Sequence, residues 1–191
     1  QYMRNAVYLN SGTPRFLEAA YLTGLADTDW TWSINFGDLD NDGWVDLFAA
    51  NGMTGDWSNS DFGRRTGLSR EGVTAKSAKM FSHVPPKREP NMAFRNRGDL
   101  SFEPVAAEWG LDFEGISFGA AFGDLDADGD LDLVVNNFGG PPSIFENTGA
   151  SGHRMVVQLV GTASNRFGIG ATVTVRLANP DQKWTRNLTG H

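Results

Sequence analysis

Short apolar runs separated by turn residues recur along this chain. Val45–Ala50 and Leu131–Val135 have the β-branched and aromatic bias of buried strands. Thr172–Leu177 alternates polar and apolar residues, and a period of two over six residues indicates a half-buried strand. The pattern therefore predicts an all-β chain built from short strands.

The pattern repeats at a fixed offset of 86 residues. Ten of eighteen positions are identical between Ile34–Asn51 and Ala120–Asn137. Earlier landmarks recur at the same offset: Asn10, Gly12, Phe16, Ala20, Gly24 and Leu25 return as Asn96, Gly98, Phe102, Ala106, Gly110 and Leu111. Phe145–Gly149 repeats the start of this pattern once more. Repeats of this size indicate stacked or radial units.

Each unit contains an Asn-x-Gly hairpin, a strand with phenylalanine, a connector ending in Gly-Leu, and two strands joined by an acidic loop. Several short strands per repeat predict a β-propeller blade. The units span about 5–91 and 92–149, which gives two blades and part of a third. Phe36, Phe48 and Phe122 stand at strand positions and are expected to fill the core between blades.

Two acidic stretches, Asp38–Asp46 and Asp124–Asp132, place aspartates at positions 1, 3, 5 and 9. Ca²⁺ takes about six to eight oxygen ligands, and carboxylates at alternate loop positions converge on one point. Gly43 and Gly129 stand where the chain must turn sharply. The sequence predicts two Ca²⁺ sites, with these ligands: Asp38, Asp40, Asp42, Asp46 and the carbonyl of Trp44; and Asp124, Asp126, Asp128, Asp132 and the carbonyl of Asp130.

An EF-hand shares only the first half of this pattern. It needs a glutamate at position 12 and flanking helices, whereas position 12 here is Ala49 or Val135 and the flanks are strand-like. The sequence therefore predicts calcium loops on β-hairpins. The alternative is an acidic surface turn without metal, in which close carboxylates would repel each other.

Phe36-Gly37-Asp38 and Phe122-Gly123-Asp124 resemble the Phe-Gly-Asp entry to the loop in FG-GAP/VCBS repeats. These repeats form calcium-binding β-propellers in integrin α-subunit heads and in many secreted bacterial proteins. The resemblance covers roughly residues 1–149. It implies a propeller scaffold with structural calcium.

Residues 150–191 have a different texture. The run Gly161–Ala171, with the sequence Gly-Thr-Ala-Ser-Asn-Arg-Phe-Gly-Ile-Gly-Ala, resembles the start of the ASPIC/UnbV module. This module follows VCBS repeats in bacterial secreted proteins and in relatives of cartilage acidic protein. The usual continuation of the module is not in the sequence, so we expect an incomplete β module here.

The length of the chain bounds the architecture. Propellers usually have at least four blades, and 191 residues hold only two and part of a third. We therefore expect either a fragment of a longer protein or a chain whose open sheet edges are covered by partner subunits.

Charge and composition narrow the environment. Nine of the 23 acidic residues lie in the two loops, and two Ca²⁺ ions would change the net charge from −7 to −3. Nothing in this distribution indicates nucleic-acid binding. The chain has no cysteine and no apolar run of membrane-spanning length. Weak extracellular calcium sites need calcium levels found outside the cytosol, so we expect a secreted or surface protein, with the periplasm as an alternative.

A long insertion at 52–91 interrupts the first unit and carries seven basic residues against four acidic ones. Long insertions are usually functional or mobile. The segment is interpreted either as a loop that contacts a protein or glycan partner, or as a variable solvated loop.

Catalytic patterns are weak. His83, His153 and His191 are isolated from each other and from any nucleophile pattern, so the sequence does not predict an enzyme. We expect extracellular recognition or adhesion through loops that bind protein or glycan. The alternatives are a structural subunit of an extracellular assembly or filament, with strands completed by neighbouring chains, and a non-catalytic accessory part of a secreted enzyme.

Overall fold

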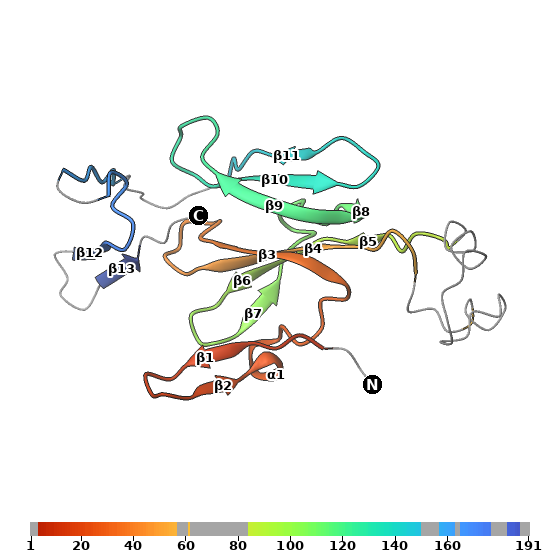
Figure 1. The fold of residues 1–191 in the computed structure, drawn as a ribbon, viewed down its shortest axis with the longest axis horizontal. Coiled ribbons are helices and arrows are strands. Elements are labelled where there is room, and N and C mark those ends of the chain that lie inside the picture. Colours follow the sequence, from red (N-terminus) through yellow and green to blue (C-terminus); the bar gives the residue numbers. More distant parts are fainter. Residues whose placement is uncertain are drawn as a thin grey trace. The chain divides into compact units, whose positions relative to one another are not determined.

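The computed structural model describes residues 4–56, 61, 84–149, 157–162, 165–176 and 183–187. The chain divides into two compact units, Gln1–Ser151 and Gly152–His191 (Figure 1). Most of the predicted insertion at 52–91 lies outside the described residues, so its role stays a prediction.

Among the described residues, the regular elements of the first unit are short antiparallel strands apart from one short helix (Figure 1). Its elements are β1 Tyr8–Asn10, β2 Phe16–Glu18, α1 Ala20–Thr23, β3 Thr31–Gly37, β4 Asp46–Asn51, β5 Glu89–Pro90, β6 Met92–Asn96, β7 Phe102–Pro104, β8 Glu114–Gly115, β9 Ser117–Gly123, β10 Asp132–Asn137 and β11 Ser143–Phe145. The largest sheet has four strands in the order β3-β4-β6-β7, and a three-stranded sheet has the order β11-β10-β9. β1 pairs with β2, and β5 pairs with β8.

The prediction of an all-β fold built from partial propeller blades is confirmed. A blade is a small antiparallel sheet of four strands, as in β3-β4-β6-β7. This sheet crosses the border between the two sequence repeats, because β3 and β4 come from the first repeat and β6 and β7 from the second. The three-stranded sheet packs beside it, with β9 against β3 and β4.

β4 organises the core because it is buried on both faces. Successive side chains of a strand point to opposite faces. Leu47 and Ala49 therefore pack with Leu25 on one side, while Phe48 and Ala50 face the three-stranded sheet on the other. This explains why the sequence of β4 is a continuous apolar run and does not alternate.

One expectation about the core was wrong. Phe48 is fully buried and Phe122 packs against the same core, but Phe36 is 62% exposed. Phe36 lies on the face of β3 that points away from the three-stranded sheet, together with Ile34, which is 50% exposed. The alternating pattern of β3 shows which face of the strand each side chain lies on. It does not show whether another element packs against that face.

The second unit contains a hairpin of β12, Thr172–Arg176, and β13, Lys183–Asn187, paired from Thr172↔Asn187 to Arg176↔Lys183. β12 alternates exposed and half-buried residues, as the sequence predicted. The likeness of this unit to the ASPIC/UnbV module stays a prediction.

Candidate metal loops

The first acidic loop connects β3 to β4. The strands close the hairpin at the pair Gly37↔Asp46. Between them, Asn41 and Gly43 have positive φ angles of 56° and 95°, which turn the chain tightly. Asparagine and glycine tolerate this left-handed backbone better than other residues.

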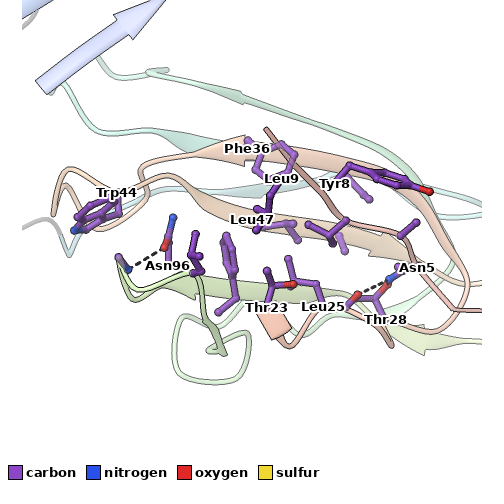
Figure 2. Close-up of a pocket in the computed structure, with 17 residues that line it drawn as sticks. Asn5, Tyr8, Leu9, Thr23, Leu25, Thr28, Phe36, Trp44, Leu47 and Asn96 are labelled. Atoms are coloured by element: carbon purple, nitrogen blue, oxygen red, sulfur yellow. Dashed lines mark hydrogen bonds between the residues drawn. The ribbon is translucent and has the colours of Figure 1, made fainter. Parts of the chain in front are cut away.

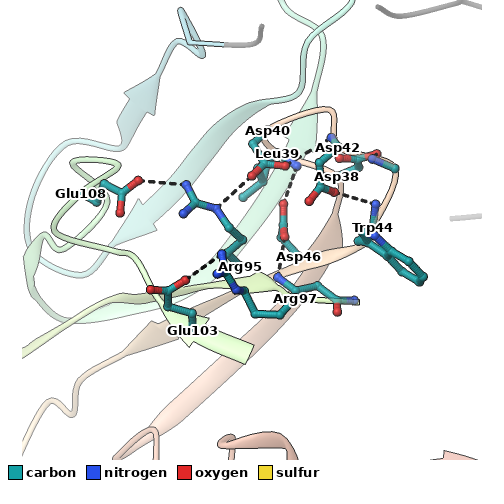
Figure 3. Close-up of polar contacts among 12 residues, drawn as sticks. Asp38, Leu39, Asp40, Asp42, Trp44, Asp46, Arg95, Arg97, Glu103 and Glu108 are labelled. Carbon is teal, nitrogen blue, oxygen red and sulfur yellow. Dashed lines mark hydrogen bonds and ion pairs between the residues drawn. The ribbon is translucent and has the colours of Figure 1, made fainter. Parts of the chain in front are cut away.

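This turn brings three carboxylates together. Oxygen atoms of Asp38, Asp40 and Asp42 lie within 4.8 Å of one another (Figure 3). Backbone amides hold these side chains in place: Gly43 N donates to Asp38 Oδ2 at 3.1 Å, and Trp44 N donates to Asp42 Oδ1 at 2.7 Å. The loop is therefore shaped by its own hydrogen bonds to keep three negative groups close.

The second loop, between β9 and β10, repeats this geometry. Asp124, Asp126 and Asp128 form an equivalent cluster, with oxygens within 4.8 Å of one another. Gly129 N donates to Asp124 Oδ2 at 3.1 Å, and Asp130 N donates to Asp128 Oδ1 at 2.9 Å. The two loops thus share both their sequence pattern and their hydrogen-bond scheme.

Asp46, the predicted ligand at position 9, braces the first loop. It is fully buried, and its two oxygens accept hydrogen bonds from Leu39 N at 2.8 Å and Asn96 N at 2.9 Å. Burial raises the pKa of Asp46 to about 6, and the nearby charges of Asp40 and Asp42 add to the rise. A cation bound in the loop would favour the charged form of this carboxyl.

Asp132 has the same place in the second loop. Its carboxylate accepts from Asn147 N at 2.9 Å and from Leu125 N at 2.7 Å. These two donors lower the pKa of Asp132, although its side chain is buried like that of Asp46. The pKa values of Asp46 and Asp132 therefore shift in opposite directions, and the surroundings of the two residues differ accordingly. Asp46 lies in β4 between two apolar cores, whereas Asp132 lies in β10, a strand with half-buried and exposed positions.

The two loops are joined to each other. Asn41 Nδ2 in the first loop donates to Asp130 Oδ1 in the second at 2.7 Å. Asn147 Nδ2, which follows β11, donates to the carbonyl of Leu39 at 2.7 Å. Hydrogen bonds therefore connect the first loop both to the second loop and to the segment after β11.

Arg95 distinguishes the two loops. Its guanidinium donates to Asp40 Oδ2 at 3.0 Å and to Glu108 Oε1 at 2.9 Å (Figure 3). It also lies over the ring of Trp109. The corresponding residue beside the second loop is Glu146, since Phe145–Gly149 repeats Phe94–Gly98. The first loop thus has a fixed cation next to one carboxylate, and the second has an acid at that position.

The structure gathers the aspartates at positions 1, 3 and 5 of each loop, as their spacing predicted. The roles of Asp46 and Asp132 as ligands, and of the Trp44 and Asp130 carbonyls, stay predictions. Sequence reasoning missed Asn41, Arg95 and Asn147. The recurrence of asparagine at Asn10, Asn96 and Asn147 was visible in the repeat and pointed to a shared structural role.

Among the described residues, no helix has both the length and the apolar character that a membrane crossing requires.

Comparison with known proteins gives one result. The model of the FG-GAP-like repeat matches residues 1–49 and 84–135, more than half of the chain, and both acidic loops lie wholly within these segments. No curated protein matches the sequence. Domains of this kind are generally non-catalytic and typically occur in extracellular or surface proteins of the adhesion type. The chain belongs to the FG-GAP-like repeat family.

Proposed function

We propose that each acidic loop binds one Ca²⁺ ion and that the ions stabilise the two hairpins. The observation that carries this proposal is the duplicated geometry. Two loops 86 residues apart hold three carboxylates each within 4.8 Å, with matching backbone hydrogen bonds. Like charges at this separation repel, and a bound cation removes the repulsion.

The donor set fits calcium. The loops offer carboxylate and carbonyl oxygens, and neither contains histidine or cysteine. Oxygen-only sites select hard cations. Flexible coordination by about six to eight oxygens suits Ca²⁺ better than Mg²⁺, which demands a near-ideal octahedron and keeps several waters.

Calcium would act here as a structural ion. When bound, it supplies positive charge at the point where the carboxylates converge. The residues of the chain make the other contacts. Asp46 accepts from Asn96 in the β6-β7 hairpin, Asp132 accepts from Asn147 after β11, and Asn41 connects the two loops. Binding to the folded state alone stabilises that state.

We place this scaffold in a secreted or surface protein that recognises a protein or glycan through its connecting loops. The family's usual location supports this proposal. A rigid sheet framework with variable connections is also a common way to present binding loops. Calcium concentrations outside the cytosol would fill sites of moderate affinity.

Calorimetric titration of the chelator-treated 191-residue chain tests the calcium proposal. We expect two equivalents of Ca²⁺ to bind, and Asp38→Asn or Asp124→Asn each to remove one. Asp112→Asn, an exposed aspartate outside both loops, is the control and should keep both. Absence of binding at millimolar Ca²⁺, or loss of both equivalents in the control, would overturn the proposal.

A further inference from the structure

An apolar pocket of about 540 Å³ lies between the two-stranded sheet β1-β2 and the four-stranded sheet. Figure 2 shows side chains from β1, β3 and β4 around it. Ile34, Phe36 and Tyr8 line the pocket and are at least half exposed. Exposed apolar side chains gathered in one hollow indicate a surface that is covered by something else.

The repeat shows what kind of sheet β1 and β2 belong to. At the offset of 86 residues they correspond to β6 and β7, which form one half of the four-stranded sheet β3-β4-β6-β7. The registers agree, since Asn10 pairs with Phe16 as Asn96 pairs with Phe102. The next connection agrees as well: Ala19 N donates to Val7 O at 2.8 Å, and Val105 N donates to Ala93 O at 2.8 Å. β1 and β2 are therefore the half of a blade that β6 and β7 form in the four-stranded sheet.

In the four-stranded sheet, β3 and β4 occupy the position that is open beside β1 and β2. β4 pairs with β6, with Phe48 opposite Ala93. Phe48 and Ala50 then pack against the neighbouring blade, against a set comprising Leu111, Ala120, Phe122, Leu133 and Val135. The residues 86 positions earlier are Leu25, Ile34, Phe36, Leu47 and Ala49, and all five line the pocket.

The comparison thus identifies what the pocket lacks. Phe48 and Ala50 of the β3-β4 hairpin fill the interface with the three-stranded sheet. The equivalent interface beside β1 has the pocket at that place. Among the described strands, β1 pairs only with β2, so no strand there takes the place that β4 has beside β6. Along β1, residues 6 and 8 correspond to Met92 and Phe94, which pair with β4.

We infer that the pocket binds a β-hairpin of the FG-GAP type: two apolar strands joined by an Asp-x-Asp-x-Asp-Gly loop. One strand of this hairpin pairs with the edge of β1 and inserts an aromatic side chain among Ile34, Phe36 and Leu47, as Phe48 does in the complete interface. Backbone pairing gives affinity and the apolar side chains give register.

The chain supplies its own probe for this inference. A second copy of residues 31–51 is fused directly ahead of residue 1. In the chain itself, the five residues 138–142 connect β10 to β11, which begins at Ser143. Residue 6 is the counterpart of Ser143, so residues 1–5 give the fused hairpin a connector of the same length. Because the sequence has no cysteine, Ile34→Cys introduces a single reactive thiol at the pocket.

The rate of thiol modification is measured with and without the fused hairpin, at constant Ca²⁺. We expect the fusion to slow modification at position 34 by about tenfold or more, because the thiol becomes buried. Ile144→Cys, on the exposed face of β11 and outside the pocket, should react equally in both chains. A fused hairpin carrying Phe48→Asp and Ala50→Asp in the added copy alone should lose the protection.

Equal rates at position 34 in the fused and unfused chains would overturn the inference. Protection that grows with protein concentration in the unfused chain would also overturn it, because a second copy would then cover the pocket in another way. Circular dichroism of each variant confirms that the strands are retained, so that a rate reports the pocket and not unfolding.

Discussion

At the scale of single residues, Arg95 makes the two acidic loops chemically unequal. It pairs with Asp40 in the first loop, and both side chains are half-buried. Its pKa is raised by Glu108 and Asp40, so it stays charged. The ion pair lowers the negative charge that the first loop offers to a cation. The second loop has an acid, Glu146, at the equivalent position.

We therefore expect Arg95→Gln to raise the Ca²⁺ affinity of the first loop by about twofold to fivefold, the range of one partly exposed ion pair. Calorimetric titration in an Asp124→Asn background isolates the first loop. Arg97→Gln is the control, because Arg97 pairs with Glu103 and both side chains are about half exposed. Unchanged or weaker binding after Arg95→Gln would contradict this role.

Gly98 is a second residue whose identity the structure explains. Its φ is +75°, and a Cβ at this position would lie 2.7 Å from Trp44 Cε2. Gly12 is its counterpart in the repeat, with φ of +72° but nothing within 4 Å. The pair separates the cost of the backbone from the cost of the clash.

We expect Gly12→Ala to lower the free energy of unfolding by about 1 kcal/mol, the usual cost of a left-handed residue. Gly98→Ala should cost about 1–2 kcal/mol more, because the indole must move. Urea unfolding of both variants gives the comparison. Equal losses would show that Trp44 does not pack against Gly98.

At the scale of elements, the structure is a set of hairpins held together by loop contacts. Each acidic loop connects two strands of its own sheet. The hydrogen bond from Asn41 to Asp130 also joins the two neighbouring sheets. Burial of β4 on both sides favours one register of the hairpin, because a slip by one residue would move Phe48 into the core that now holds the smaller side chains of Leu47 and Ala49.

A double-mutant cycle tests this junction. Asn41→Ala and Asp130→Ala, measured by urea unfolding in chelator, should show a coupling of about 1.5–3 kcal/mol, as expected for a hydrogen bond to a charged group. The cycle of Asn41→Ala with Asp112→Ala, which lies outside both loops, should be additive. A coupling near zero for the first pair would mean that the loops are independent.

Much of this organisation could be predicted from the sequence. The apolar runs predicted β4 and β10, and the aspartate spacing predicted the two clusters, because both features are local. The pair of Arg95 with Asp40 could not be predicted, since 55 residues separate the partners. The exposure of Phe36 was missed for a related reason: a strand's pattern shows which way a side chain points but not what lies opposite. β5 and β8 are too short to show any periodicity.

At the scale of the whole molecule, the net charge of −7 is concentrated where the ions are proposed to bind. Without cations, this concentration opposes the close approach of the strands that carry the loops. With two Ca²⁺ ions the charge would fall to −3, as the addition of four positive charges requires. Stability of the first unit should therefore depend on calcium more than on ionic strength in general, because a bound ion neutralises the clustered carboxylates directly, whereas dissolved salt only screens them.

If bound calcium stabilises the fold, the temperature of unfolding must depend on calcium. At Ca²⁺ about 100-fold above the dissociation constant, each site contributes about 2.7 kcal/mol. For a chain of this size, two sites should raise the midpoint by roughly 10–20 °C over that in chelator. Magnesium at the same concentration should have a much smaller effect. A midpoint that is the same in Ca²⁺ and in chelator would contradict the account.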